Sequence, residues 1–232
     1  MLRAQLESDR FHHEYYSSHA LFEAGTWLEK PNSSVMELGS FLAGRDGVRA
    51  LDLGAGVGRN SIPFVKLFGS GAVLCDCVEI LPMAVEKLRE NAKVFDVADR
   101  IAPICSTVSE YQIAPEVYDL VTAMSVLEHA YDRDTISNGI RTIQAGTKIT
   151  GFNCLSFATD LTETDLDTGR ALEPLISTRL SKEECRSLFS ALYADWEIQK
   201  LDFSSFGEQL NRDGRTISWR ANYCIFVARR TG

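Results

Sequence analysis

Residues 50–60 read ALDLGAGVGRN, a short apolar run that ends in Asp52 and Leu53 and is followed by three alternating glycines. A short apolar run of this kind is typical of a buried strand. The glycines permit a tight turn and let a ligand approach the backbone. A helix after such a turn presents unpaired N–H groups to that ligand. The stretch therefore predicts a strand, a binding loop and a helix at the edge of an open α/β sheet.

Strand-like and helical segments alternate after this loop. The alternation favours a Rossmann-like, doubly wound, seven-stranded and mostly parallel sheet. The last two strands have no helix between them, which predicts an antiparallel C-terminal hairpin turning at Gly214. The expected strands are 48–53, 72–79, 101–105, 117–124, 148–157, 196–203 and 216–228, and the expected helices after the loop are 59–68, 81–95, 135–145 and 181–193.

The chain of 232 residues is expected to form a single domain, 1–232. N-terminal helices, broken around Lys30-Pro31, form a helical cap over 1–45, and the acidic, threonine-rich stretch 158–178 is expected to be an irregular insertion over the strand ends. Pro63 falls early in the helix after the glycine loop, so that helix begins with Pro63 in its first turn or kinks there. Ser181 and Glu184 have the spacing of a capping box.

Charge and composition narrow the partners. The formal net charge is −8 and no run of Lys or Arg occurs, which disfavours nucleic acid and suits small molecules or positively charged groups. No apolar run is long enough to span a membrane and the N-terminus has no apolar leader segment, so a cytoplasmic location is expected. The six cysteines and four histidines show no ligand spacing, so no metal site is expected. The oligomeric state stays open.

The acid beside the glycine loop bears on the kind of ligand. The sequence GAGVG departs from the GxGxxG pattern that holds a pyrophosphate. A zwitterionic ligand suits it better, with its carboxylate on the amides of Gly54, Ala55, Gly56 and Asn60 and its ammonium on Asp52, directly or through water. In the alternative reading, Asp52 only accepts hydrogen bonds from the loop amides.

An adenosine group fits the next two strand ends. Glu79 ends the second strand, where a carboxylate accepts from both ribose hydroxyls, although a solvated carboxylate is the plain alternative. Ile80 covers one adenine face, and Thr107 and Val108 meet its edge. The fourth strand lies within YDLVTAMSVLEHA, residues 118–130, and ends at Met124, after which Ser125 to His129 line the cleft. His129 frames the ligand, caps a helix or acts as a general base.

Taken together, residues 50–60, Glu79 and 118–130 resemble class I S-adenosyl-L-methionine (SAM)-dependent methyltransferases over roughly residues 48–158. LDLGAGVGRNS further resembles the tellurite-resistance methyltransferase family, as do Tyr15-Tyr16, Trp27 and a C-terminal series that includes Arg220. The resemblance implies SAM as cofactor and S-adenosyl-L-homocysteine (SAH) as product. It implies these cofactor-binding residues: Asp52, Gly54, Ala55, Gly56, Asn60, Glu79, Ile80, Thr107, Val108, Met124, Ser125 and His129.

The predicted function is methyl transfer from SAM to a small-molecule acceptor by in-line displacement. Positioning alone supplies roughly 7–11 kcal/mol of barrier reduction, so no catalytic residue is predicted. Tyr16 and Trp27 are candidates for a lid over the cofactor, and Arg220 for binding an anionic acceptor. Gln209-Leu210-Asn211 stands where the tellurite-resistance family carries a histidine. The acceptor therefore stays open between oxyanion, amine, hydroxyl and thiol.

Two other functions compete with this one. A SAM-binding protein with little catalytic activity, acting as a sensor or assembly partner, is the alternative that the missing histidine suggests. A nicotinamide-dependent oxidoreductase shares the pattern of a glycine loop followed by an acid. Methylation of the amino group of adenine or glutamine is disfavoured, because Met124-Ser125-Val126-Leu127 replaces the Asn/Asp-Pro-Pro-Tyr/Phe motif.

Overall fold

A computed structural model describes residues 2–69, 71–130, 132–174, 176–212 and 214–232. A mixed sheet runs through it in the order β3-β2-β1-β4-β5-β8-β7, with a two-residue strand β6 paired to β5. Its strands are β1 Val48–Leu53, β2 Val73–Glu79, β3 Ile101–Cys105, β4 Tyr118–Met124, β5 Thr147–Asp165, β6 Ala171–Leu172, β7 Trp196–Arg212 and β8 Arg215–Arg230. The helices are α1 Leu2–Ser18, α2 Ser33–Leu42, α3 Ser61–Lys66, α4 Pro82–Val94, α5 Arg133–Gly146 and α6 Lys182–Leu192, with a 3-10 turn η1 at Leu127–His129.

The order of the strands creates the place where ligands bind in such sheets. The chain builds β2 and β3 on one side of β1, and then β4 and β5 on the other, all of them parallel. Strand order thus reverses between β1 and β4, and a crevice opens beyond their carboxyl ends. Strands β8 and β7 complete the sheet as an antiparallel hairpin. The predicted Rossmann-like fold with a C-terminal hairpin is confirmed.

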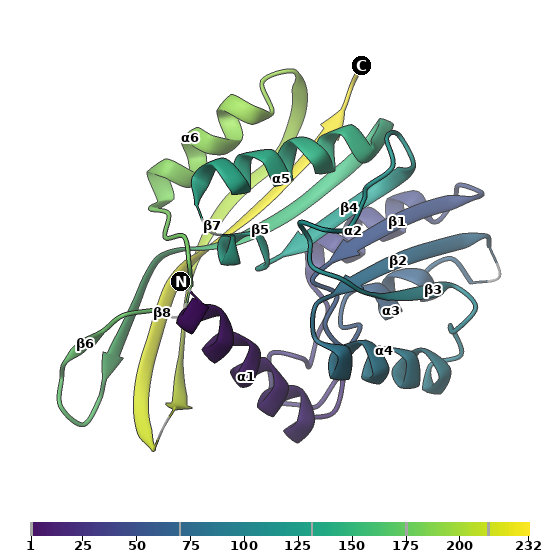
Figure 1. Cartoon of the computed structure of the whole chain (residues 1–232). Helices are drawn as coiled ribbons and strands as arrows, with labels where there is room; N and C mark the ends of the chain where they lie inside the picture. Colours follow the sequence, from purple (N-terminus) through teal and green to yellow (C-terminus); the bar gives the residue numbers. More distant parts are fainter. Residues whose placement is uncertain (1, 70, 131, 175, 213) are drawn as a thin grey trace.

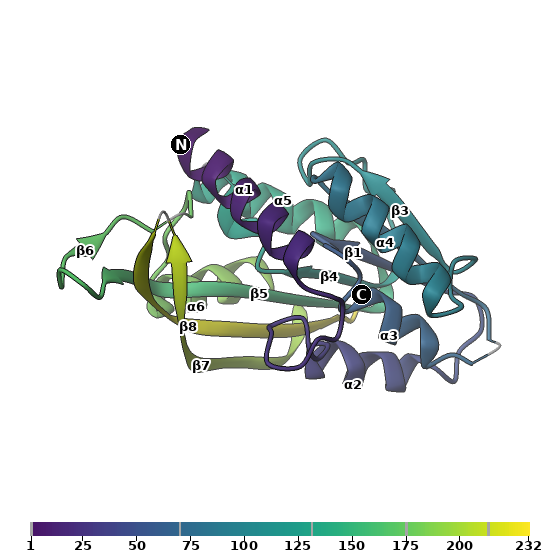
Figure 2. The same cartoon turned by 90° about the horizontal axis from the view of Figure 1, so that it is seen from below.

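Helices cover both faces of the sheet (Figures 1 and 2). One apolar core joins the sheet to α2, α3 and α4, and includes Leu38, Phe64 and Leu88. The other joins it to α5 and α6, where the rings of Phe189 and Phe226 stack with centroids 4.0 Å apart. These two cores hold the strand ends in place, so that the loops above them can carry the site.

The residues that begin the helices can be compared with the sequence predictions. Asn32 caps α2 by accepting from the backbone N–H groups of Ser34 and Val35. Ser181 and Glu184 form the predicted capping box at the start of α6. Pro63 lies in the first turn of α3, as expected, although α3 is shorter than the predicted helix and ends at Lys66.

The stretch 158–178 corrects the sequence analysis. Its predicted irregular structure is wrong for the first half, because β5 continues to Asp165 and pairs with β8 from Phe152↔Arg229 to Asp165↔Ile217. Strands β7 and β8 are correspondingly longer than predicted. The polar residues 158–165, which suggested a loop, form the end of β5. This part of the strand extends beyond the core, so one of its faces is partly exposed to solvent.

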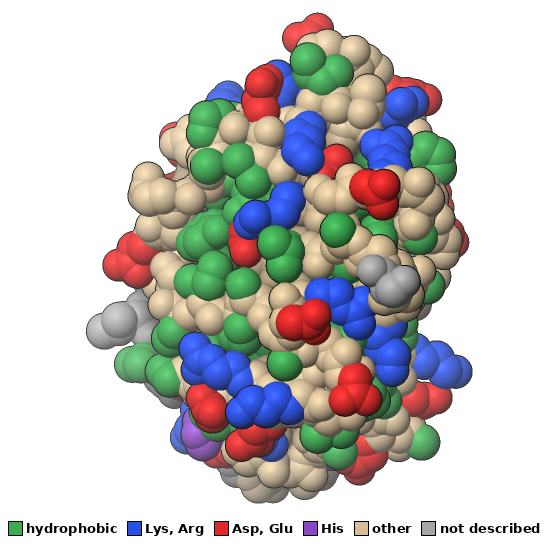
Figure 3. All heavy atoms as spheres, turned by 90° about the vertical axis from the view of Figure 1, so that its right-hand side faces the viewer, with side chains coloured by type: hydrophobic (Ala, Val, Ile, Leu, Met, Phe, Trp, Pro, Cys, Tyr) green, Lys and Arg blue, Asp and Glu red, His purple; other side chains and the backbone are tan. Residues whose placement is uncertain are grey.

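We call the projecting part of this sheet the blade, comprising residues 158–165 of β5, 204–212 of β7 and 215–223 of β8. Figures 1 and 2 show the blade extending beyond the helical layers, with α1 lying across the space between it and α4. Over the described residues, no helix is long and apolar enough to cross a bilayer, and no group of His, Cys, Asp and Glu is arranged to hold a metal. On the side shown in Figure 3, acidic and basic side chains are interspersed.

Candidate functional site

A cleft of about 1170 Å³ lies at the carboxyl ends of the parallel strands. The glycine loop, the ends of β2 and β4, helix α1 and the blade all contribute to its walls. Pockets for single ligands are usually about 300–1,000 Å³, so this cleft has room for more than one small molecule. The structure brings nearly all the sequence-predicted residues to it: Tyr16, Trp27, Gly54, Ala55, Gly56, Asn60, Glu79, Ile80, Thr107, Val108, Met124, Ser125 and His129.

The glycine loop can be built only from glycines at its key positions. Gly54, Gly56 and Gly58 have φ angles of +71°, +54° and +97°, a backbone region that strains other residues. A Cβ atom on Gly54 would lie 2.9 Å from the side chain of Val126, and one on Gly56 would lie 2.6 Å from the hydroxyl of Tyr16. The loop therefore packs directly against the segment after β4 and against α1.

Glu79 is fixed at the end of β2 by two backbone donors. The N–H of Gly56 donates to Glu79 Oε2 and the N–H of Leu81 donates to Oε1, each at 2.9 Å. The residue is 7% exposed and lines the cleft. Since an ionised carboxylate accepts about four hydrogen bonds, both oxygens retain acceptor capacity toward a ligand.

Asp52 does not lie where direct ligand binding would require it. Its carboxylate is buried beneath the loop, outside the lining of the cleft, and Oδ1 accepts from the hydroxyl of Thr122 at 2.7 Å. Burial raises the pKa of Asp52 to about 6. The position of Asp52 does not favour a direct contact with a ligand in the cleft, whereas a contact through water stays a prediction. On β1, alternate side chains point to opposite faces, and position 52 points into the layer below α3.

The far end of the cleft carries the residues predicted for adenine. Ile80 is 41% exposed, which is high for an apolar side chain at a strand end, and it lines the cleft with Val108. Thr107 accepts from the N–H of Glu110 at 3.1 Å, so its hydroxyl shapes the turn itself. The amide oxygen of Asn60 accepts from the N–H of Asn32 at 2.9 Å and ties the loop to the start of α2.

The segment after β4 places hydroxyl groups at the centre of the cleft. Ser125 has a φ of +56°, which is uncommon for a residue other than glycine and is found most often at functional sites. Its Oγ lies 2.5 Å from the hydroxyl of Tyr223 and 3.2 Å from that of Ser156. This arrangement joins the end of β4 to β5 and β8, where the blade begins.

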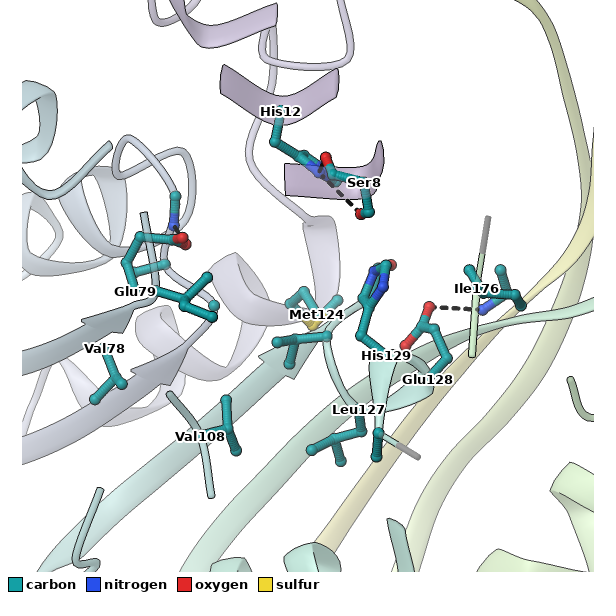
Figure 4. A pocket seen from close by; sticks show the side chains of 18 of the residues that line it. Ser8, His12, Val78, Glu79, Val108, Met124, Leu127, Glu128, His129 and Ile176 are labelled. Carbon is teal, nitrogen blue, oxygen red and sulfur yellow. Dashed lines mark hydrogen bonds between the residues drawn. The ribbon is translucent and has the colours of Figure 1, made fainter. Parts of the chain in front are cut away.

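His129 faces helix α1 across the cleft (Figure 4). Its ring centroid lies 6.4 Å from that of His12, whose Nδ1 donates to the carbonyl of Ser8 at 2.9 Å. Burial, and secondarily the proximity of His12, lowers the pKa of His129 to about 4. The imidazole is therefore neutral at physiological pH and lines the cleft without adding charge.

Glu128 lies within the segment 125–129 that the sequence predicts to line the cleft, although no role is predicted for it. It is 2% exposed and lines the cleft, and its Oε1 accepts from the N–H of Ala158 at 3.2 Å. Burial raises its pKa to about 7, and Oε2 has no hydrogen-bond partner within the described part of the chain. Its position beside His129 in the LEH turn is the only signal the sequence offers, because the burial comes from β5 and the segment before α6.

Helix α1 packs onto the glycine loop through aromatic side chains. Tyr16 is 6% exposed, and both burial and the charge of Glu79 raise its pKa. Arg59 donates to the carbonyl of Trp27 at 2.9 Å, and its guanidinium lies 5.3 Å from the centroid of that ring. The sequence identifies Arg59 only as part of the loop motif, whereas in the structure its side chain lines the loop side of the cleft.

Arg220 is corrected as a candidate for the acceptor site. It is exposed and does not line the cleft, because its position on β8 points to the outer face of the blade. The neighbouring Trp219 points inward together with Glu163 and Glu208, its register partners on β5 and β7. The sequence predicted a strand here but not which of its faces lines the cleft.

Parts of this chain match the sequences of known proteins. Residues 50–151 match the family model for a methyltransferase domain. The chain is 27% identical over 146 residues to 27-O-demethylrifamycin SV methyltransferase of Amycolatopsis mediterranei (strain S699), covering 62% of this chain and 51% of that protein. The chain thus spans about half the length of this curated relative.

Solved structures share the fold at low sequence identity. TehB from Haemophilus influenzae superimposes with a TM-score of 0.64 at 17% identity, over 89% of this chain and 64% of that one. The cyclase SpnF does so with a TM-score of 0.55 at 15% identity, over 84% and 80%. At this identity the likeness concerns the fold alone. Residues 50–151 thus match a methyltransferase domain, and the chain shares the Rossmann-like fold of these solved structures.

Proposed function

We propose that this chain transfers a methyl group from SAM to a small-molecule acceptor. The observation that carries the proposal is the cleft itself, which is lined on one side by the glycine loop and a fixed acid at the end of β2 and on the other side by the blade; we call these two sides its lobes. One lobe has the polar groups that adenosine and a zwitterionic tail require. The other has space for a second reactant.

The residues of the first lobe fit SAM. The carboxylate of Glu79 would accept hydrogen bonds from the ribose hydroxyls. Ile80, Thr107 and Val108 line the part of the cleft in which we propose that the adenine binds. The N–H groups of Gly54, Ala55 and Gly56 already donate to the carbonyl of Val78 and to Glu79, which corrects the prediction that they bind the ligand carboxylate. The guanidinium of Arg59 lines the cleft and suits the carboxylate of the cofactor. Met124, Ser125 and His129 line the passage toward the blade. SAM, when bound, supplies a methyl group on a sulfonium, which is already activated for displacement.

The protein's part in such a reaction is orientation and exclusion of water. Helix α1 covers the loop through Tyr16, and His12 faces His129 across the cleft. Holding two reactants in line supplies roughly 7–11 kcal/mol of barrier reduction without a dedicated acid or base.

Calorimetric titration with SAM and SAH tests the cofactor half of the proposal. Release of SAH over a panel of amines, alcohols, thiols and oxyanions then tests transfer. We expect SAH to bind and one acceptor class to support turnover. Absence of binding at millimolar concentration would overturn the proposal. Binding without transfer to any class would instead favour a SAM-binding sensor.

A further inference from the structure

The blade presents one continuous face to the cleft. Strand register places Glu163, Trp219 and Glu208 side by side across β5, β8 and β7. Because paired and alternate residues share a face, this inner face also carries Phe206, Leu210, Arg212 and Tyr223. All seven side chains line the cleft, whereas the intervening Arg220 does not.

Aromatic rings dominate this face. The ring centroids of Phe206 and Trp219 lie 5.9 Å apart, those of Phe206 and Tyr223 6.0 Å, and those of Trp219 and Tyr223 6.5 Å. Phe206 remains 43% exposed, unusual for a phenylalanine lining a cavity. Three rings at these distances form an open aromatic surface, and the negative faces of such rings attract an organic cation.

The charges on the inner face are unequal. Arg212 is held by an ion pair with Glu163, whose side chain is 2% exposed, so neither charge is available to a ligand. Glu208, by contrast, makes no hydrogen bond or ion pair with any described residue, and burial raises its pKa. Glu208 lines the cleft, as do Ser8, Phe11 and His12 of α1.

We propose that the inner face of the blade is the acceptor subsite and that it binds an organic cation, an ammonium group on an apolar body. Trp219, Tyr223 and Phe206 surround the cation. The carboxylate of Glu208, which has no ion-pair partner among the described residues, supplies the opposite charge. The same arrangement disfavours oxyanions and carboxylates, because Arg212, the one basic side chain among the described residues of this face, is already paired with Glu163. That the bound cation is the methyl acceptor rests on the proposed function, whereas the binding of a cation at this face does not.

Three aromatic probes of similar size and different charge test this directly. 2-Phenylethylammonium, 2-phenylethanol and phenylacetate are titrated into the SAH-saturated protein by calorimetry. We expect the ammonium probe to bind about tenfold more tightly than the alcohol and the carboxylate probe to bind most weakly. Equal affinities, or tighter binding of phenylacetate, would overturn the inference.

Substitutions locate the binding. Glu208→Gln should abolish the preference for ammonium over alcohol, and Trp219→Leu should weaken both probes. Glu197→Gln, on the same strand but paired with Arg229 outside the cleft, is the charge-matched control and should change nothing. An unchanged preference in Glu208→Gln would contradict the assignment, provided that SAH affinity shows the variant is folded.

The inference and the proposed function fail in different ways. If SAH binds and no probe discriminates by charge, the cation subsite is wrong and methyl transfer stands. If the ammonium probe binds selectively to the protein while neither SAM nor SAH binds, the cation subsite stands and the proposed function is wrong.

Discussion

At the scale of single residues, Glu79 is the most specific test of the cofactor site. Replacing Glu79 by Gln removes a charged acceptor from the place proposed for the ribose. We expect the dissociation constant for SAH to rise about 5- to 150-fold, which corresponds to about 1–3 kcal/mol. Calorimetric titration measures it, and the exposed Glu90→Gln on α4 is the control. An unaltered constant would show that the ribose lies elsewhere.

The buried carboxyl group of Glu128 should make the stability of the folded state depend on pH. Burial raises its pKa to about 7 from an ordinary value of 4.5, so between these values the folded state binds more protons than the unfolded state. Stability must therefore fall as pH rises through this window and level off above it. Relative to Glu128→Gln, the wild-type protein should lose on the order of 3 kcal/mol of unfolding free energy.

Urea unfolding of both proteins at several pH values between about 4.5 and 8 checks this difference. The exposed Glu86→Gln, whose carboxylate is paired with Arg89 on the surface of α4, serves as the control. A wild-type protein that gained stability relative to Glu128→Gln with rising pH would show that the carboxylate is stabilised by a charge partner in the fold.

At the scale of elements, we expect the contact between α1 and the glycine loop to affect ligand binding at the loop side of the cleft. Gly56 and Gly69 both have a φ of +54°, but a Cβ at Gly56 meets the Tyr16 hydroxyl at 2.6 Å, whereas one at Gly69 meets nothing within 4 Å. Both alanine variants share a cost of roughly 1 kcal/mol for backbone strain. Only Gly56→Ala should also weaken SAH binding, by tenfold or more.

Calorimetry on the two variants separates strain from displacement of the helix. Adding Tyr16→Phe to Gly56→Ala removes the clashing oxygen and should recover part of the affinity. Equal SAH affinities for Gly56→Ala and Gly69→Ala would mean that the contact between α1 and the glycine loop does not affect SAH binding.

At the scale of the whole molecule, cofactor binding should couple the two ends of the cleft. A ligand at 100 times its dissociation constant stabilises the folded state by about 2.7 kcal/mol. Helix α1 borders both the loop and the blade, so its amides should gain more protection from hydrogen exchange on SAH binding than those of α5, which packs on the core. Hydrogen-exchange mass spectrometry measures this. Uniform protection of α1 and α5 would contradict a covering role for α1.

The sequence predicted the side of the cleft formed by the glycine loop better than the side formed by the blade. Local rules suffice where glycine spacing, apolar runs and capping residues act over a few positions, as in β1, the glycine loop and α6. The blade depends instead on pairing between β5 and residues some 50 to 80 positions later, such as Thr162 with Arg220. Which of Trp219 and Arg220 faces the cleft follows from that pairing and from the path of α1, neither of which composition or periodicity reveals.

The length of β5 constrains how proteins with this design can diversify. The same strand, Thr147–Asp165, is part of the central sheet and continues into the blade, in register with β8 almost throughout. Inserting or deleting one residue would exchange the two faces of every residue beyond it. Acceptor preference in descendants of this chain should therefore drift by side-chain replacement on alternate positions, while changes in length accumulate at the hairpin tips, where they leave the inherited alternation intact.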